Sequence, residues 1–199
     1  MGVRQIMNKA IFLDRDGVID RPVFSNTSGE FEPPHRVEDI SLYPWTLEGL
    51  KIAAENGFLL FIVSNQPDYA KGKCSLEDLI EVHNRLDEIF KSSGINFSDY
   101  YYCYHHPDGI VAGYSGVCEC RKPKPYFLKK AEKEFSIDMS RSWMIGDRET
   151  DIACGKNAGV RTILVKSEEQ AARQATGADF TADNLLDGIK LIVSFKFNE

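Results

Sequence analysis

Two aspartates, Asp14 and Asp16, follow a short apolar run and precede Gly17. If the chain stays extended as far as Asp16, the two side chains point the same way, because side chains alternate along a strand. Such a pair could hold a cation, or one carboxylate could attack a phosphorus atom while the other moves a proton. Strand ends often carry aspartate, so this pair alone is weak evidence of a site.

A second acidic pair, Asp147 and Asp151, is spaced by one helical turn. Acidic residues are also favoured near helix N-termini for electrostatic reasons, so this pair alone is moderate evidence. The order of the polar residues is more specific. The first acidic pair is followed by Ser64-Asn65 after a second apolar run, then by Lys122 before a helical segment, and then by the second acidic pair.

Three of the five cysteines lie near a histidine. Cys103-Tyr-His105 and Cys118-Glu-Cys120 supply three thiols and one imidazole, the donor set of a closed tetrahedral zinc site. Alternatively, Cys103 is a core residue and the other two are surface thiols. Exposed thiols in Cys-x-Cys are liable to oxidation without a metal, which favours zinc. His106 lies outside this set.

Short apolar runs alternate with amphipathic segments and must position these residues. The runs predict strands at 9–14, 58–64, 99–103, 142–147, 161–166 and 178–181. The amphipathic segments predict helices at 46–56, 75–94, 124–135, 149–158 and 185–195. This alternation is typical of an α/β fold with a parallel sheet and helices on both faces. Ligands of such sheets bind beyond the carboxyl ends of the strands, where both acidic pairs fall.

Two stretches do not fit the alternation, a long predicted loop at 21–44 and an excursion rich in Gly, Pro and Cys at 105–125. Loops of this length in a compact domain are usually functional or disordered. No insertion is long enough for a large cap domain. We therefore expect a single domain over 1–199, with a zinc loop at about 103–120 and a specificity loop at about 21–44.

The composition excludes several classes of protein. Of the 199 residues, 43% are hydrophobic and 27% are charged, as in globular chains that need no disulfides. The net charge of −6 argues against non-specific binding to nucleic acid or to anionic membranes. The run from Phe58 to Val63 is too short to span a bilayer. With no signal-peptide pattern, we expect a cytoplasmic protein with reduced cysteines; its oligomeric state stays open.

The ordered polar sections resemble those of the haloacid dehalogenase-like (HAD) superfamily of phosphohydrolases, whose sheet is Rossmann-like. The sections are Phe12-Leu-Asp-Arg-Asp-Gly-Val18, Ile62-Val-Ser-Asn65, Arg121-Lys-Pro123 and Ile145-Gly-Asp-Arg-Glu-Thr-Asp151. The resemblance spans residues 9 to about 166. It implies hydrolysis of a phosphomonoester with Mg²⁺ as cofactor.

The resemblance also implies a role for each residue. Asp14 would be the nucleophile that forms an aspartyl-phosphate, and Asp16 would protonate the leaving oxygen and later deprotonate water. Ser64 and Lys122 would hold the phosphoryl group. The implied Mg²⁺ ligands are Asp14, the backbone carbonyl of Asp16 and Asp147, with Asp151 supporting them. The implied substrate-binding residues are Asn65, Gln66, Arg121 and Arg148.

Cys103-Tyr-His-His-Pro107 followed by Cys118-Glu-Cys-Arg-Lys-Pro123 is similar to the D-glycero-D-manno-heptose 1,7-bisphosphate phosphatases. A related zinc loop occurs in histidinol phosphatases, and in both the zinc orders a loop. The resemblance implies a small phosphorylated metabolite as partner, with the long 104–117 loop favouring a sugar phosphate. Histidinol phosphate or another small phosphomonoester is one alternative. A non-catalytic phosphate-binding protein is the other, although Asp14, Asp16, Lys122 and Asp147 are all present.

Two segments depart from this pattern. After Ser64-Asn-Gln66 the heptose phosphatases typically continue Ser-Gly-(Ile/Val)-Ala-Arg-Gly, whereas this chain has Pro67-Asp-Tyr-Ala-Lys-Gly72. The 21–44 loop also looks several residues longer than usual. Because both segments follow strands that end in predicted catalytic residues, we expect them to determine which ester is accepted.

Overall fold

The computed structural model describes residues 7–166 and 177–196. Six parallel strands form one sheet in the order β5-β4-β1-β6-β7-β8. The strands are β1 (Lys9–Leu13), β4 (Phe58–Asn65), β5 (Asp99–Cys103), β6 (Trp143–Gly146), β7 (Arg161–Val165) and β8 (Phe180–Ala182). The predicted α/β fold is confirmed. The chain first crosses from β1 to β4 and later returns to the other side of β1, so the strand order reverses beside β1, where ligands of such sheets bind.

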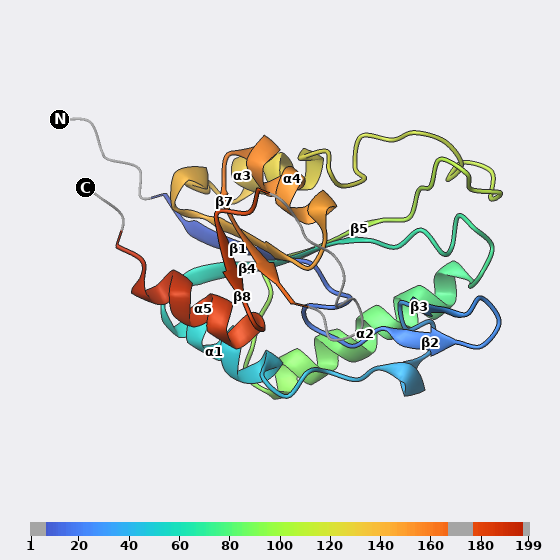
Figure 1. Cartoon of the computed structure of the whole chain (residues 1–199), viewed down its shortest axis with the longest axis horizontal. Coiled ribbons are helices and arrows are strands. Elements are labelled where there is room, and N and C mark those ends of the chain that lie inside the picture. Colours follow the sequence, from blue (N-terminus) through green and yellow to red (C-terminus); the bar gives the residue numbers. More distant parts are fainter. Residues whose placement is uncertain (1–6, 167–176, 197–199) are drawn as a thin grey trace.

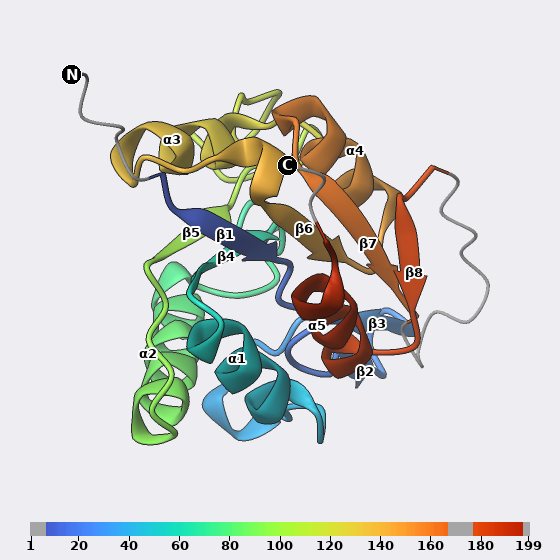
Figure 2. The same cartoon turned by 90° about the vertical axis from the view of Figure 1, so that its left-hand side faces the viewer.

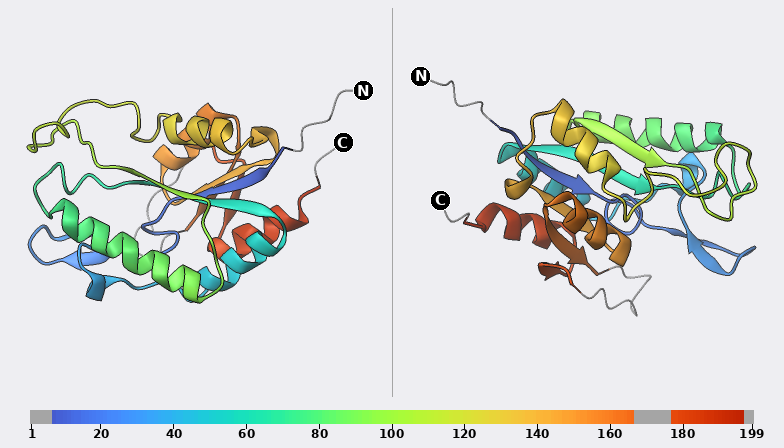
Figure 3. Two further views of the ribbon diagram at one scale, coloured as in Figure 1. Left: turned by 180° about the vertical axis from the view of Figure 1, so that it is seen from behind. Right: turned by 90° about the horizontal axis from the view of Figure 1, so that it is seen from above.

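Among the described residues, five α-helices cover the sheet on both faces. They are α1 (Thr46–Glu55), α2 (Leu76–Ser92), α3 (Tyr126–Glu134), α4 (Glu149–Ala158) and α5 (Leu185–Ser194). Figure 2 shows α1, α2 and α5 on one side of the sheet and α3 and α4 on the other, and Figure 3 shows the same layers from behind. A capping box begins α2, as the sequence predicts, with the Ser75 hydroxyl accepting from the Asp78 amide at 3.0 Å.

The core consists of two apolar clusters, one on each face of the sheet. In β1, Ile11 and Leu13 pack on the face of α1, α2 and α5, while Ala10 and Phe12 pack on the face of α3 and α4. All four side chains are fully buried, which explains why the strand reads as a continuous apolar run. A strand held on both faces gives the residues that follow it a fixed position.

Part of the 21–44 segment, which the sequence predicts to be a loop, forms regular secondary structure. It contains an antiparallel hairpin of β2 (Val23–Ser25) and β3 (Glu30–Glu32), followed by the short 3-10 helix η1 (Val37–Asp39). The loop prediction is wrong for these residues, because strands of three residues are too short to show an alternating pattern. Figure 1 and the right view of Figure 3 show the hairpin at the same end of the molecule as the loops that follow β4 and β5.

No helix within residues 7–166 and 177–196 combines the length and the apolar composition that crossing a membrane requires.

Candidate active site

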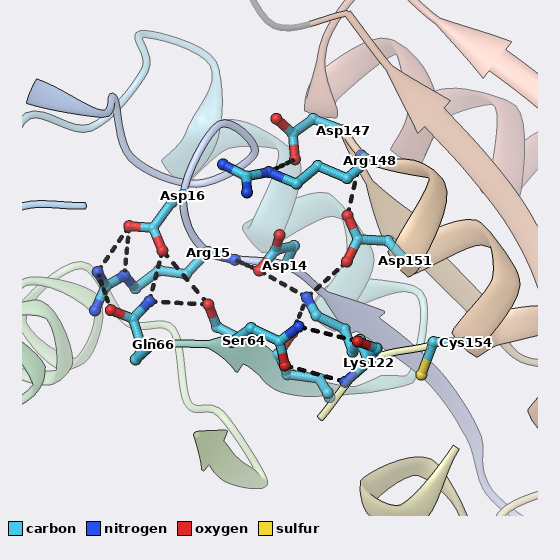
Figure 4. A network of polar contacts seen from close by, with 12 residues as sticks. Asp14, Arg15, Asp16, Ser64, Gln66, Lys122, Asp147, Arg148, Asp151 and Cys154 are labelled. Carbon is cyan, nitrogen blue, oxygen red and sulfur yellow. Dashed lines mark hydrogen bonds and ion pairs between the residues drawn. The ribbon is translucent and has the colours of Figure 1, made fainter. Parts of the chain in front are cut away.

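The predicted catalytic residues meet at the carboxyl edge of the sheet (Figure 4). Asp14 follows β1, Ser64 lies near the end of β4, and Asp147 follows β6. Lys122 comes from the segment that precedes α3. These side chains are all at least nine-tenths buried, so charges here interact in a medium that screens them poorly.

Lys122 links two carboxylates at the centre of the site. Its Nζ lies 2.9 Å from Asp14 Oδ1 and 2.7 Å from Asp151 Oδ1, and it donates to the Val63 carbonyl at 2.7 Å. Burial alone would favour the neutral amine, but the two carboxylates outweigh it and raise the pKa of Lys122. The ammonium is therefore charged and fixed.

Asp14 is held as a carboxylate. Burial favours the neutral acid, but the Lys122 charge outweighs this effect and keeps the pKa of Asp14 below its usual value. The Arg15 amide also donates to Asp14 Oδ1, at 2.8 Å. Both contacts fall on the same oxygen, which leaves Oδ2 for attack on an electrophile.

Asp147 has the surroundings expected of a metal ligand. Both of its carboxylate oxygens are buried, and neither has a hydrogen-bond partner among the described residues. Burial, followed by the charges of Asp14 and Asp151, raises the pKa of Asp147 well above its usual value. Burying such a group is costly unless a cation or a donor meets it. One oxygen from each of Asp14, Asp147 and Asp151 lies within 4.8 Å of the others, so a divalent cation bound by Asp14 and Asp147 would lie among three carboxylates.

The backbone at Gly17 leaves room for this arrangement. Gly17 has φ +89°, and a Cβ there would lie 2.6 Å from Asp147 Oδ2. Any larger residue would therefore collide with the carboxylate, besides adopting a strained backbone. The glycine turn lets β1 and β6 bring their aspartates together.

Asp151 supports the other groups. Its Oδ2 accepts from the Arg148 amide at 3.0 Å at the start of α4, and its Oδ1 faces Lys122. Burial and the Asp14 charge raise the pKa of Asp151 to about 6, against the opposing charge of Lys122. With both oxygens engaged by the protein, Asp151 is suited to positioning Lys122.

Asp16 belongs to a separate network beside Asp14. Its Oδ2 accepts from Gln66 Nε2 at 2.6 Å and from the Ser64 hydroxyl at 3.4 Å. Its Oδ1 accepts two bonds from Arg15, from Nε at 3.0 Å and from Nη2 at 2.7 Å. Arg15 is fully buried. Sequence reasoning missed it, although a cation between two aspartates at the end of an apolar run is a signal of a buried ion pair.

The four predicted substrate-binding residues differ in their surroundings. Asn65 exchanges two hydrogen bonds with the Lys122 backbone, at 3.0 and 3.2 Å. Gln66 contacts Asp16 and Arg15. Arg121 donates to the His105 carbonyl at 3.2 Å. Arg148 Nε lies 3.9 Å from Asp147 Oδ1, and Figure 4 shows its guanidinium reaching over the site between Asp147 and Asp14.

The predicted zinc ligands also come together. The Sγ atoms of Cys103, Cys118 and Cys120 lie 3.1 to 3.6 Å apart, and His105 Nδ1 lies 3.6 Å from Cys120 Sγ. All four donor atoms lie within 4.8 Å of one another. Sulfurs bound tetrahedrally at the usual zinc–sulfur distance are about 3.8 Å apart, so the cluster fits zinc with little adjustment. His106 is outside the cluster, where its Nδ1 accepts from the Asp108 amide at 3.1 Å.

Comparison with known proteins agrees with this geometry. Residues 119–190 match the HAD-hydrolase-like family. The chain is 32% identical to a D-glycero-beta-D-manno-heptose-1,7-bisphosphate 7-phosphatase of Yersinia pestis, over 92% of this chain and 94% of that protein. It is 34% identical to a D-glycero-alpha-D-manno-heptose-1,7-bisphosphate 7-phosphatase of Photorhabdus laumondii, over 92% and 96% of the two chains.

Among solved structures, the fold is similar to that of the D,D-heptose 1,7-bisphosphate phosphatase of B. bronchiseptica complexed with magnesium and phosphate. That match has a TM-score of 0.77 at 21% identity and covers 93% of this chain and 98% of the other. The chain therefore belongs to the HAD-like hydrolases, in the family of heptose-1,7-bisphosphate phosphatases.

Proposed function

We propose that the protein hydrolyses a phosphomonoester of a small sugar phosphate, D-glycero-D-manno-heptose 1,7-bisphosphate, through an aspartyl-phosphate on Asp14. The contact between Asp14 and Lys122 carries this proposal, because it keeps a buried carboxylate ionised next to a fixed cation. The names of the relatives supply the substrate.

In the first step, Asp14 Oδ2 attacks phosphorus and the bond to the leaving oxygen breaks. Asp16, once protonated on Oδ2, gives that proton to the leaving oxygen. Ser64 and Lys122 hold the oxygens of the phosphoryl group during transfer. In the second step, Asp16 takes a proton from water, which attacks the aspartyl-phosphate and releases phosphate and Asp14.

Asp14, Asp147 and the Asp16 carbonyl would hold Mg²⁺. The orphaned oxygens of Asp147 support this assignment. Bound there, Mg²⁺ offsets the repulsion between the anionic nucleophile and the anionic ester. Lys122 and Arg148 add positive charge from the protein.

Zinc would be bound by Cys103, His105, Cys118 and Cys120, and its role would be structural. The cluster lies on the segment that leads into Arg121 and Lys122, so its folding fixes the backbone that carries both cations. The zinc loop also packs on the segment after β4, where Ile110 and Val111 both donate to the Ala70 carbonyl, at 2.7 and 3.1 Å.

Two contacts join the segments proposed to select the substrate. His35 Nε2 lies 2.9 Å from Asp68 Oδ2, and Lys73 forms an ion pair with Glu32. The hairpin is thus tied to the segment after β4. Burial lowers the pKa of His106, and the positive charges of Lys71 and Arg121 lower it further, so both cations lie near this histidine.

A phosphate-release assay over a panel of esters tests this proposal. The panel contains heptose 1,7-bisphosphate, hexose phosphates, histidinol phosphate and 4-nitrophenyl phosphate, each with and without Mg²⁺. We expect the highest kcat/KM with the heptose bisphosphate and no release without Mg²⁺. A higher kcat/KM for histidinol phosphate would change the assigned substrate to that ester. No phosphate release with any ester would favour a non-catalytic phosphate-binding protein. The cytoplasmic location and the single-domain organisation stay predictions.

A further inference from the structure

Asp20 is a fully buried aspartate that the proposed mechanism does not use. It follows the glycine turn after Asp16, where the Gly17 amide donates to the Asp20 carbonyl at 2.8 Å and the Asp20 amide donates to the Arg15 carbonyl at 3.2 Å. Neither oxygen of its carboxyl group has a hydrogen-bond partner among the described residues. Arg15 faces this carboxyl group, with its Nε 3.6 Å from Asp20 Oδ2.

Arg15 is the link between Asp20 and the proposed acid–base Asp16. Its guanidinium donates twice to Asp16 Oδ1, and its Nη2 also donates to Gln66 Oε1 at 3.1 Å. Gln66 therefore contacts the outer end of the guanidinium, while Asp20 faces its Nε. These two contacts restrict how far the guanidinium can slide or turn, and with it the Asp16 carboxyl group.

The placement of Asp20 is unfavourable for the residue itself. Burial raises the pKa of its carboxyl to about 8, with Arg15 opposing the rise and Asp16 and Asp14 adding to it. Buried charge arrangements are often no more stable than well-packed apolar side chains, so stability alone does not account for an aspartate here. A carboxyl group that faces Arg15 does place a polar group beside Nε, at 3.6 Å.

We infer that Asp20 is a positioning residue, which holds the guanidinium of Arg15 so that Asp16 is aligned to give its proton to the leaving oxygen. The inference rests on the proposed function, because it requires Asp16 to be the acid. A small misplacement of a proton donor lowers the rate steeply. The loss is greatest for esters whose leaving oxygen is strongly basic, because these depend most on protonation.

The test compares two substrates and two variants. The sugar phosphate has a basic alkoxide leaving group, whereas 4-nitrophenyl phosphate has a weakly basic one. For Asp20→Ala we expect kcat/KM to fall about tenfold or more with the sugar phosphate and by less than about threefold with the aryl ester. Asp20→Asn keeps a polar group of the same shape beside Nε and should stay within about threefold of the unmodified protein on both.

An equal loss on both esters would overturn the inference, as would an Asp20→Asn variant no better than Asp20→Ala. Thermal unfolding checks that each variant is folded. If Asp20→Ala does not fold, Arg15→Lys is tested in its place. Lysine keeps the positive charge but cannot donate the paired hydrogen bonds that the guanidinium gives Asp16. This variant should show the same split between the esters, and an equal loss would again count against the inference.

Two further measurements separate this inference from the proposed function. The unmodified protein must release phosphate, and Asp16→Asn must lose far more activity with the sugar phosphate than with the aryl ester. If either fails, the proposed function is at fault. If both hold and Asp20→Ala affects the two esters equally, only the role of Asp20 is wrong.

Discussion

Lys122 Nζ lies 2.9 Å from Asp14 Oδ1, and both side chains are buried. We expect Lys122→Met to remove the charge that opposes burial, so that the pKa of Asp14 rises. A neutral Asp14 is a poor nucleophile, and kcat should fall by at least about a hundredfold. Steady-state assays at several pH values measure this. A variant with kcat within threefold of the unmodified protein would mean that Lys122 plays no part in turnover.

The cluster of Cys103, His105, Cys118 and Cys120 predicts one bound zinc per chain. Elemental analysis of protein purified without added metal should give about one equivalent, and Cys118→Ser should reduce it. Cys74→Ser is the matched control, because Cys74 lies outside the cluster. Hydrogen exchange should show faster exchange of the 103–120 backbone in Cys118→Ser only. Less than half an equivalent of zinc, with no other metal in its place, would refute the prediction.

The hairpin should affect specificity more than chemistry. Shortening the segment from Asn26 to Pro33 should raise KM for the sugar phosphate much more than for 4-nitrophenyl phosphate. The physical reason is that a site which pairs substrate hydroxyls discriminates strongly, whereas the aryl ester needs only the catalytic groups. If both esters lose the same factor, the hairpin is a structural cover. If neither changes, recognition lies at Arg121 and the zinc loop.

The contact between His35 and Asp68 leads to a prediction about the stability of the fold in acid. Burial alone would raise the pKa of Asp68, but the hydrogen bond from His35 and the charge of Lys73 outweigh it and lower the pKa. Because the folded-state pKa is lowered, ionised Asp68 stabilises the fold above its ordinary pKa of 3.8, and this stability is lost as the pH falls through the lower folded value.

His35→Ala should therefore raise the pKa of Asp68 and shift acid unfolding, followed by circular dichroism, to higher pH. His83→Ala is the control, because His83 contacts the Tyr102 hydroxyl at 3.3 Å and forms no ion pair with a carboxylate that the structure records. An unchanged acid transition in His35→Ala, or an equal shift in both variants, would contradict this account of Asp68.

The strands and the aspartates that follow them could be predicted from the sequence for one physical reason. Strands buried on both faces, such as Phe58–Asn65, must be apolar throughout, so the polar residue at each end is conspicuous. Parallel strands then bring those ends to one edge. The observed bounds of the six sheet strands and five α-helices that the sequence predicts differ from the expected ones by one or two residues at most.

The rest depends on contacts between distant segments. The β2–β3 hairpin has strands of three residues, which carry no periodic signal. Arg15 and Asp20 read as ordinary loop charges until the glycine turn brings them together in the interior. Asp147, whose oxygens lack partners, lies beside Asp14 because β6 pairs with β1 in the sheet. Composition and spacing do not encode which polar atoms lack partners.

The most direct test of the account is the covalent intermediate on Asp14. The protein is mixed rapidly with a sugar phosphate labelled in the phosphoryl group, quenched with acid and digested, and the labelled peptide is identified by mass spectrometry. We expect the label on the peptide that contains Asp14 and none in Asp14→Asn, whose turnover should be lower by several orders of magnitude. Label on another residue, or an Asp14→Asn variant that keeps a tenth of the activity, would contradict the central claim.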